Sequence, residues 1–271
     1  MKTISINGHE LALERRGRGE VTILVHGAVG DLRTWQAQMD ALAAGHDLIA
    51  YSRRWHFPNS THFNGTPYTV ETHVADLLGL IAAIGAPVKL VGHSYGGAVC
   101  AVAALMRPDL VRCLVLAEAS LFTLLLTRPE GLFALAQSGG AMSHVAPLVR
   151  QGKKEQALKA FLDVILGPGY FENLPPEVKG VMFDNLHTVE PMLNGMNAGG
   201  SFKAEHASQI RVPTLVLQGE RSPAMFRITS EILAEKIPGV ERVVLPGISH
   251  GLQLEAPEEF NRAVLKFLGK H

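Results

Sequence analysis

Short apolar runs alternate with helix-period patterns along most of this 271-residue chain. Residues 21–25 (VTILV) form an apolar run with Thr22 as its one polar member, which is typical of a strand buried on both faces of a parallel sheet. Trp35, Met39 and Leu42 then recur at i, i+4 and i+7, which predicts a helix with one buried stripe. Because strands alternate with helices, we predict an α/β fold with a mostly parallel sheet covered by helices on both faces.

The alternation continues on both sides of a central interruption. Asn7-Gly8, between two short alternating runs, predicts a hairpin at the start of the chain. A helix is expected from residue 70, stopped by Gly85 and Pro87, and another over residues 95–106. Further strands are predicted at residues 46–52, 88–94, 111–120, 212–220 and 241–247.

The strand pattern stops after Ser120 and resumes beyond residue 205. The intervening sequence has helical periodicity with Gly- and Pro-containing breaks. Its clearest apolar stripe consists of Ala157, Leu158, Phe161, Leu162, Ile165 and Leu166. We therefore predict a core domain of residues 1–120 and 206–271, interrupted by a helical cap of residues 121–205.

The composition restricts the partners and the compartment. Lys plus Arg (25) balance Asp plus Glu (25) without a basic block, which disfavours nucleic acid or an anionic membrane as a partner. Cys100 and Cys113 suggest no disulfide framework and suit a reducing compartment. The polar N-terminus lacks a signal-peptide pattern, and no apolar stretch is long enough to span a membrane. We predict a soluble cytoplasmic protein.

Residues 92–96 (GHSYG) place Ser94 in a Gly-x-Ser-x-Gly run where a predicted strand meets a predicted helix. A sharp strand-to-helix turn strains the backbone at the serine, and Gly92 and Gly96 let the flanking chain pass. The helix N-terminus adds free N–H groups and a dipole that favours an anion. A glycine-rich turn with an incidental serine is the alternative, but the flanking elements favour Ser94 as a nucleophile.

A serine hydroxyl needs a base, and the chain offers 12 histidines. His250 follows the strand expected at residues 241–247, on a loop before the last helix. The carboxyl edge of an open parallel sheet is where ligand-binding groups gather, so we predict His250 as the base. A surface histidine is the alternative. His26 and His93 adjoin turn glycines and are expected to brace loops.

Five segments together resemble the α/β-hydrolase fold superfamily, in the subgroup with a helical cap: residues 26–42, 92–97, 111–120, 212–220 and 247–260. The resemblance covers essentially the whole chain and is more specific for the fold than for the substrate. It implies a triad in the chain order Ser–acid–His. It also implies an oxyanion hole made by the backbone N–H groups of Ala28 and Tyr95.

The acid of this triad departs from the usual pattern. The superfamily most often has an aspartate three residues after Gly219, where this chain has Ser222. Glu118 ends the strand that follows the nucleophile helix, and some similar dehalogenases and lactonases draw their acid from that strand end. Glu220 is the competing carboxylate, and loss of the acid is the third possibility. We prefer Glu118.

Candidate substrate contacts come from one loop and from the cap. Trp55 stands where the superfamily often has a glycine, and it could roof one side of the cleft or simply pack within its loop. Phe122, Leu125, Met182 and Met192 belong to the cap, where Leu and Met runs also serve helix packing. If they line the cleft, the substrate carries a hydrophobic group.

We therefore predict a serine hydrolase that cleaves a carboxylic ester or lactone through an acyl-enzyme on Ser94, without a metal or other cofactor. Hydrolysis of a C–C bond in a β-diketone-like substrate is the alternative with the same groups, and a cofactor-free peroxidase-like activity stays open. Epoxide hydrolysis and dehalogenation are disfavoured, because those relatives use an aspartate where Ser94 stands. A non-hydrolytic ligand receptor is the alternative outside catalysis.

Overall fold

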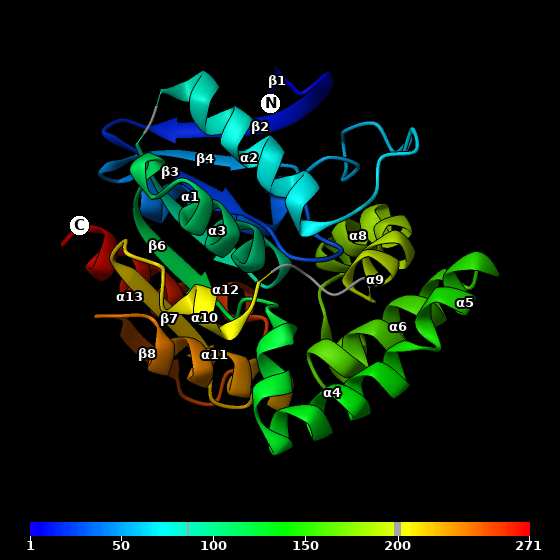
Figure 1. Cartoon of the computed structure of the whole chain (residues 1–271). Helices are drawn as coiled ribbons and strands as arrows, with labels where there is room; N and C mark the ends of the chain where they lie inside the picture. Colours follow the sequence, from blue (N-terminus) through cyan, green and yellow to red (C-terminus); the bar gives the residue numbers. More distant parts are fainter. Residues whose placement is uncertain (86, 198–201) are drawn as a thin grey trace.

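The computed structural model describes residues 1–85, 87–197 and 202–271, which form an eight-stranded sheet between helices (Figure 1). The strand order is β1-β2-β4-β3-β5-β6-β7-β8. β2 pairs antiparallel with β1 and β4, and all other neighbours pair parallel. The strands are β1 Lys2–Ile6, β2 His9–Gly17, β3 Glu20–Val25, β4 His46–Tyr51, β5 Val88–His93, β6 Val111–Ala117, β7 Thr214–Gly219 and β8 Glu241–Leu245.

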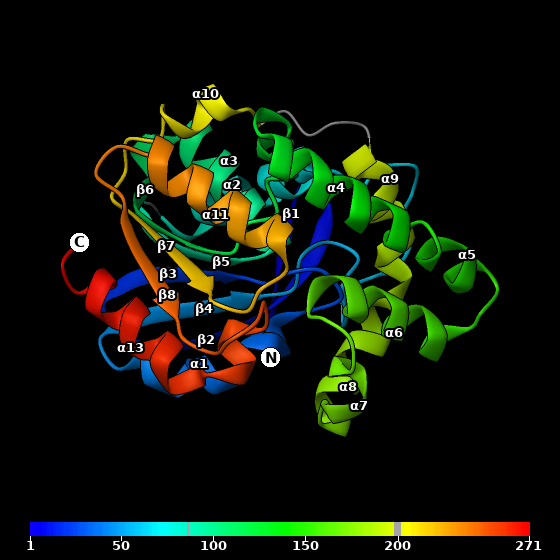
Figure 2. The ribbon, with the colours of Figure 1, turned by 90° about the horizontal axis from the view of Figure 1, so that it is seen from below.

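Helices cover both faces of the sheet, as Figure 2 shows. One face carries η1 Leu32–Trp35, α1 Gln36–Ala43, α12 Leu252–Glu255 and α13 Pro257–Leu268. The opposite face carries α2 Val70–Ile84, α3 Tyr95–Met106 and α11 Ala224–Lys236, and η2 Pro108–Leu110 leads into β6. The predicted fold class, a mostly parallel sheet with helices on both faces, is confirmed.

The helix α2 illustrates how local sequence sets an element. The Thr69 hydroxyl accepts a hydrogen bond from the Thr72 backbone N–H and so caps the first turn. Gly85 ends the helix with a φ of 91°, a conformation that L side chains rarely adopt. Val74 and Leu77 lie on its buried face, which packs against α3.

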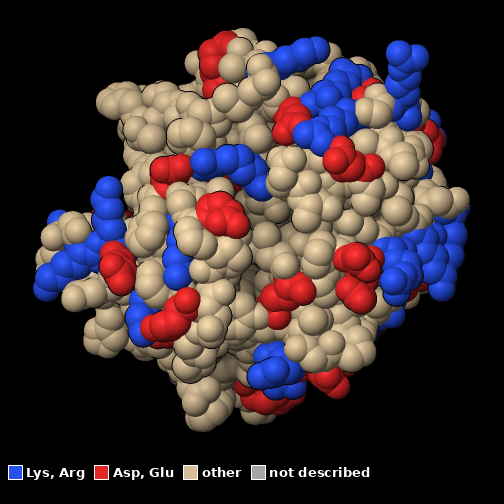
Figure 3. All heavy atoms as spheres, turned by 180° about the vertical axis from the view of Figure 1, so that it is seen from behind, with Lys and Arg blue, Asp and Glu red and all other residues tan. Residues whose placement is uncertain are grey.

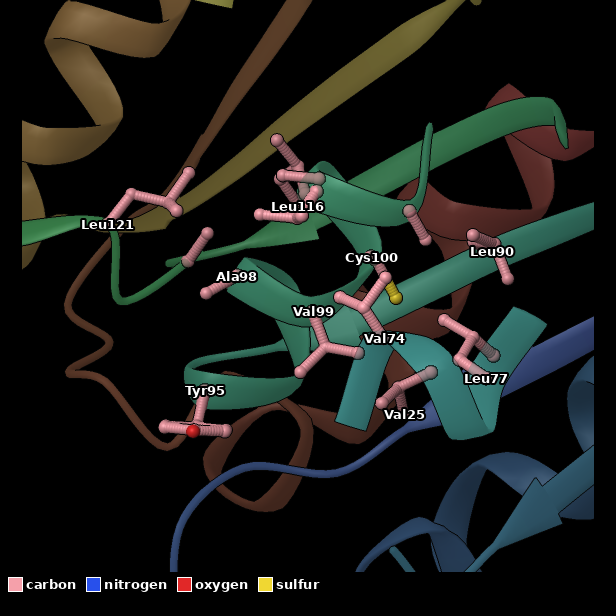
Figure 4. Packing of buried hydrophobic residues seen from close by; sticks show 14 of the residues in the cluster. Val25, Val74, Leu77, Leu90, Tyr95, Ala98, Val99, Cys100, Leu116 and Leu121 are labelled. Atoms are coloured by element: carbon pink, nitrogen blue, oxygen red, sulfur yellow. The ribbon is translucent and has the colours of Figure 1, made fainter. Parts of the chain in front are cut away.

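The core between α3 and the sheet is built from small and branched apolar side chains (Figure 4). Val99 and Cys100 of α3 are fully buried against the cluster that includes Val25, Leu90 and Leu116 of the sheet. Each such Val or Leu side chain contributes about 1.5–3 kcal/mol when it is fully removed from water. This packing fixes α3, and with it the turn that precedes it.

The chain between β6 and β7, where the cap is predicted, is helical and lies beside the carboxyl ends of the parallel strands (Figures 1 and 2). Its helix α4 packs against α11 of the core domain. The boundaries at residues 121 and 205 stay a prediction. The elements of this segment are η3 Phe122–Thr127, α4 Pro129–Met142, α5 Val145–Arg150, α6 Lys154–Ile165, α7 Tyr170–Asn173, α8 Pro176–Asn185, η4 Leu186–Thr188, α9 Val189–Asn197 and α10 Ala204–Ala207.

Charged side chains of both signs are interspersed over the face shown in Figure 3. This mixed surface agrees with the balanced totals of 25 basic and 25 acidic residues. Among the helices of the described ranges, none is both long enough and apolar enough to cross a bilayer. Cys100 and Cys113 are free and buried, and burial raises the pKa of the Cys113 thiol to about 12.

Candidate active site

The strand order reverses direction around β3, which lies between β4 on one side and β5 on the other. Crevices at such switch points collect ligands at the carboxyl ends of the strands. Here His26 follows β3 and Ser94 follows β5, so the two predicted halves of the oxyanion hole start from this crevice. The topology therefore brings the loops after residues 25 and 93 together.

Ser94 stands on a strained turn between β5 and α3, with φ 53° and ψ −119°. A Cβ on Gly92 would lie 2.6 Å from the Gly96 carbonyl oxygen, and a Cβ on Gly96 would lie 2.1 Å from the Val25 carbonyl oxygen. Only glycine fits at both positions, because such distances are far below van der Waals contact. The Gly-x-Ser-x-Gly run thus allows a turn that holds Ser94 at a helix N-terminus.

The structure brings Ser94, His250 and Glu118 into one hydrogen-bonded row. His250 Nε2 lies 3.0 Å from Ser94 Oγ, and His250 Nδ1 lies 2.6 Å from Glu118 Oε2. The second carboxylate oxygen of Glu118 accepts the Gly219 backbone N–H at 2.7 Å. Since the carboxylate accepts from Nδ1, Nε2 is the atom free to accept the serine proton. This is the arrangement by which a base activates a serine hydroxyl.

The competing acid lies elsewhere. Glu220 is exposed, and its Oε2 accepts the Gly247 backbone N–H at 2.8 Å. Ser222, at the position of the more common aspartate, is buried beside Glu118 and only partly offsets the burial that raises the pKa of that carboxyl group. The Ser222 hydroxyl nevertheless falls short of hydrogen-bond geometry with any described partner. Of the two nominated carboxylates, only Glu118 reaches His250.

Burial dominates the electrostatics of the His250–Glu118 pair. It raises the pKa of Glu118 to about 7 and lowers the pKa of His250 to about 3, because both charged forms lose water. The Phe226 ring contributes to this exclusion of water by stacking on His250 with ring centroids 3.5 Å apart. His250 is therefore neutral at rest and able to accept a proton.

Ala28 and Tyr95, whose backbone N–H groups are the predicted oxyanion donors, both line the cavity that contains Ser94. Neither N–H group makes a hydrogen bond to another described residue, and the Tyr95 N–H is the first of α3, which has no partner within the helix. Gly27 keeps the two loops close, since a Cβ there would lie 3.1 Å from the Cβ of Ser94. Two residues with free backbone N–H groups thus line the same cavity as Ser94.

Ser94 and His250 open into a cavity of about 480 Å³ between the core domain and the cap. Three of the predicted contacts line it: Phe122, Met182 and Met192. Most of the other cap residues around it are also apolar, including Leu135, Met142, Phe161, Ile165 and Leu166. The cavity therefore suits an apolar group.

Two predicted contacts are wrong. Trp55 is fully buried outside this cavity, between Phe63 and Tyr68 at ring-centroid distances of 4.8 and 5.5 Å. Leu125 is also fully buried, in a small cluster with Met225 beneath the cavity wall. Both side chains serve packing, because size and hydrophobicity alone do not determine which way a side chain points.

Ser120 and Phe226 are neighbours of the triad that the sequence analysis missed. Ser120 lines the cavity, and its Oγ lies 3.1 Å from Ser94 Oγ. Phe226 also lines the cavity and covers the His250 ring. Ser120 could have been found from its place two residues after Glu118, but nothing in the sequence indicates which helix face carries Phe226.

Two other histidines, His26 and His93, hold loops beside the site. His93 Nε2 lies 2.8 Å from the carbonyl oxygen of His250 and so holds the loop of that residue. His26 Nδ1 lies 2.9 Å from the Gly27 carbonyl oxygen. Within residues 1–85, 87–197 and 202–271, no group of three or more His, Cys, Asp or Glu side chains is placed to hold a metal ion.

Sequence and structure comparisons identify the family. The model of the alpha/beta hydrolase fold family matches residues 21–257. The chain belongs to this family. It is 36% identical over 108 residues to an epoxide hydrolase of Caballeronia sordidicola, a match that covers 39% of this chain and 33% of that protein. Epoxide hydrolase A of Mycobacterium tuberculosis is 27% identical over 98% of this chain and 96% of its own length.

Among solved structures, the bromoperoxidase from Bacillus anthracis superposes with a TM-score of 0.81, at 26% identity and with 99% of each chain covered. The activities in the names of these relatives differ from one another. Family membership therefore establishes the fold, and the reaction has to be derived from the side chains of the site.

Proposed function

We propose that the protein is a serine hydrolase that cleaves a carboxylic ester or lactone with a hydrophobic group. The single observation that carries the proposal is the row from Ser94 Oγ through His250 to Glu118, which opens into the 480 Å³ cavity. Acyl transfer needs an activated nucleophile, a base that is held by an acid, and donors for an oxyanion.

In the proposed mechanism, Ser94 attacks the substrate carbonyl carbon while His250 accepts its proton. The carbonyl oxygen becomes an oxyanion between the N–H groups of Ala28 and Tyr95. His250 then returns the proton to the leaving alkoxide as the C–O bond breaks, which leaves an acyl group on Ser94. Water, deprotonated by His250, attacks the acyl carbon, and His250 returns this proton to Ser94 Oγ as the acyl–oxygen bond breaks and the carboxylic acid is released.

The serine favours an acyl substrate over an epoxide. Attack of a hydroxyl on an epoxide carbon would form an ether, and water at neutral pH does not cleave an ether. An acyl-enzyme ester, in contrast, is hydrolysed by the same base that formed it. The epoxide hydrolases among the relatives are thus evidence for the family, and Ser94 supports carbonyl chemistry for this chain.

A fluorophosphonate probe tests the activated nucleophile. The parent protein should be labelled at Ser94, and Ser94→Ala should not be labelled. Hydrolysis of p-nitrophenyl esters with acyl chains of increasing length should favour apolar chains over charged ones. A protein that is unlabelled between about pH 6 and about pH 9 would instead be a ligand receptor, because a base of this kind works near neutral pH. A β-diketone cleaved faster than any ester or lactone would favour C–C hydrolysis.

A further inference from the structure

A buried arginine lies behind the loop that carries Ala28. Arg53 follows β4 and is 1% exposed. Its Nη2 donates to the Gly27 carbonyl oxygen at 3.0 Å, and its Nε donates to the His26 carbonyl oxygen at 3.2 Å. Its Nη1 donates to the Tyr68 hydroxyl at 2.9 Å. The guanidinium is therefore hydrogen-bonded directly to the backbone of the proposed oxyanion loop.

The neighbouring arginine shows what is unusual about Arg53. Arg54 is also buried, but it forms an ion pair with Asp76. Arg53 forms no ion pair with a described carboxylate, and its positive charge faces carbonyl oxygens and the ring of Tyr95, whose centroid lies 4.7 Å away. A buried charge without a counter-ion is costly to retain for stability alone.

The Gly27 carbonyl receives a second donor. His26 Nδ1 lies 2.9 Å from this oxygen, and His26 Nε2 accepts the Arg53 backbone N–H at 2.9 Å. A carbonyl can only accept, so Nδ1 carries the proton and the ring is a neutral donor. Burial holds the pKa of His26 well below its ordinary value, which keeps the ring in this form.

The Gly27 carbonyl and the Ala28 N–H belong to one peptide group. This peptide is trans, so its N–H points away from the carbonyl and hence away from Arg53. Two donors on the oxygen, one of them charged, pull electron density toward it and make the N–H a stronger donor. They also fix the plane of the peptide before substrate arrives.

We propose that Arg53 is a positioning residue that polarises and orients the Gly27–Ala28 peptide for oxyanion binding. This inference rests on the proposed function, because it assigns the Ala28 N–H to the oxyanion. The effect should be strongest in the transition state, where the substrate oxygen carries negative charge, and weak toward the neutral carbonyl of the bound ester.

Arg53→Met tests the inference, with Arg54→Lys as the matched control in the adjacent buried arginine. For Arg53→Met we expect kcat on a p-nitrophenyl ester to fall about 10- to 100-fold while KM stays within about twofold. The inhibition constant of a trifluoromethyl ketone, which forms a tetrahedral oxyanion on serine, should rise by a similar factor. Arg54→Lys should lower the melting temperature and leave both kcat and KM close to those of the parent.

Arg53→Lys decides the matter if Arg53→Met does not fold, because lysine keeps the charge but lacks the fork that holds both carbonyls. In Arg53→Lys, kcat should fall less than in Arg53→Met, and KM should again stay nearly unchanged. Equal values of kcat and of the inhibition constant in a folded Arg53 variant and the parent would overturn the inference.

The amide proton shift of Ala28, measured by NMR in ¹⁵N-labelled protein, separates this inference from the proposed function. This measurement requires no catalytic activity. The Ala28 amide proton resonance should move upfield in the Arg53 variant and should be unchanged in Arg54→Lys. If the parent hydrolyses no ester or lactone, the proposed function fails while this arm still reports on Arg53. An unchanged Ala28 shift in the Arg53 variant would overturn the polarisation.

Discussion

The carboxyl ends of β6 and β7 are neighbours in the sheet, and each is followed by a glutamate, yet the two glutamates do different things. In the register, Ala117 pairs with Leu217, and the Glu118 backbone N–H donates to the Leu217 carbonyl at 3.0 Å. Glu118 turns inward, with a φ of 48°, and meets His250. Glu220 faces solvent and holds the loop after β8.

The proposed triad acid is thus distinguished by its position relative to the histidine, whichever strand supplies it. β6 provides the charge through Glu118, and β7 provides a backbone donor, the Gly219 N–H, to the same carboxylate. Ser222 takes the space beside it, 2.7 Å from where a Cβ on Gly219 would lie. The usual place of the aspartate therefore still borders the acid, but as a neutral group.

The largest effect is expected for Glu118→Gln. The amide cannot stabilise the imidazolium form of His250, so kcat/KM should fall about 10³- to 10⁴-fold, a loss of roughly 4–5.5 kcal/mol. Ester hydrolysis gives the value, and a thermal melt verifies folding. Glu220→Gln is the matched control and should stay within about threefold of the parent. A Glu118→Gln enzyme within about tenfold of the parent would contradict the assignment.

A second change moves the charge from β6 to β7. Ser222→Asp in the Glu118→Gln background restores a carboxylate at the common position, and kcat/KM should recover about 10- to 100-fold over the single variant. The comparison of single and double variants on one ester is the measurement. If the double variant gains nothing over Glu118→Gln, a carboxylate at the end of β7 does not serve His250.

The pH dependence of kcat/KM reports on the buried Glu118–His250 pair. The proposed mechanism needs the Glu118 carboxylate and a neutral His250, and burial raises the pKa of Glu118 to about 7. The direction follows: kcat/KM should be lost as pH falls through about 7 and should level off above it. Glu118→Gln should remove this limb. A profile that is flat from about pH 5 to about pH 9 would count against the pair.

The smallest expected effect concerns the cap. Met192→Ala enlarges the cavity at its apolar wall, so the preferred acyl chain should lengthen and the ratio of kcat/KM for long over short esters should rise about tenfold. Leu125→Ala, outside the cavity, should cost roughly 2–4 kcal/mol of stability and leave that ratio unchanged. An altered ratio in Leu125→Ala alone would show that the wall has been assigned to the wrong residues.

Much of this site follows from local sequence, because strand ends are marked by apolar runs. Ser94, Glu118 and His250 each follow such a run, and the parallel topology brings these ends to one edge. The contacts that hold the loop of the proposed oxyanion hole could not be predicted in this way. Arg53 is far from the loop in sequence, and only the folded chain reveals that it contacts Gly27 and is itself held by the Tyr68 hydroxyl.

The assignment of Glu118 as the partner of His250 is tested most directly by the proton resonance of His250 Nδ1–H. This resonance can be observed by NMR in ¹⁵N-histidine-labelled protein and assigned by its absence from His250→Gln. A charge-assisted hydrogen bond as short as 2.6 Å to Glu118 predicts a strongly downfield resonance. This resonance should persist in Glu220→Gln and move upfield or disappear in folded Glu118→Gln. A resonance that is unchanged in Glu118→Gln and lost in Glu220→Gln would contradict the account and assign the acid to β7.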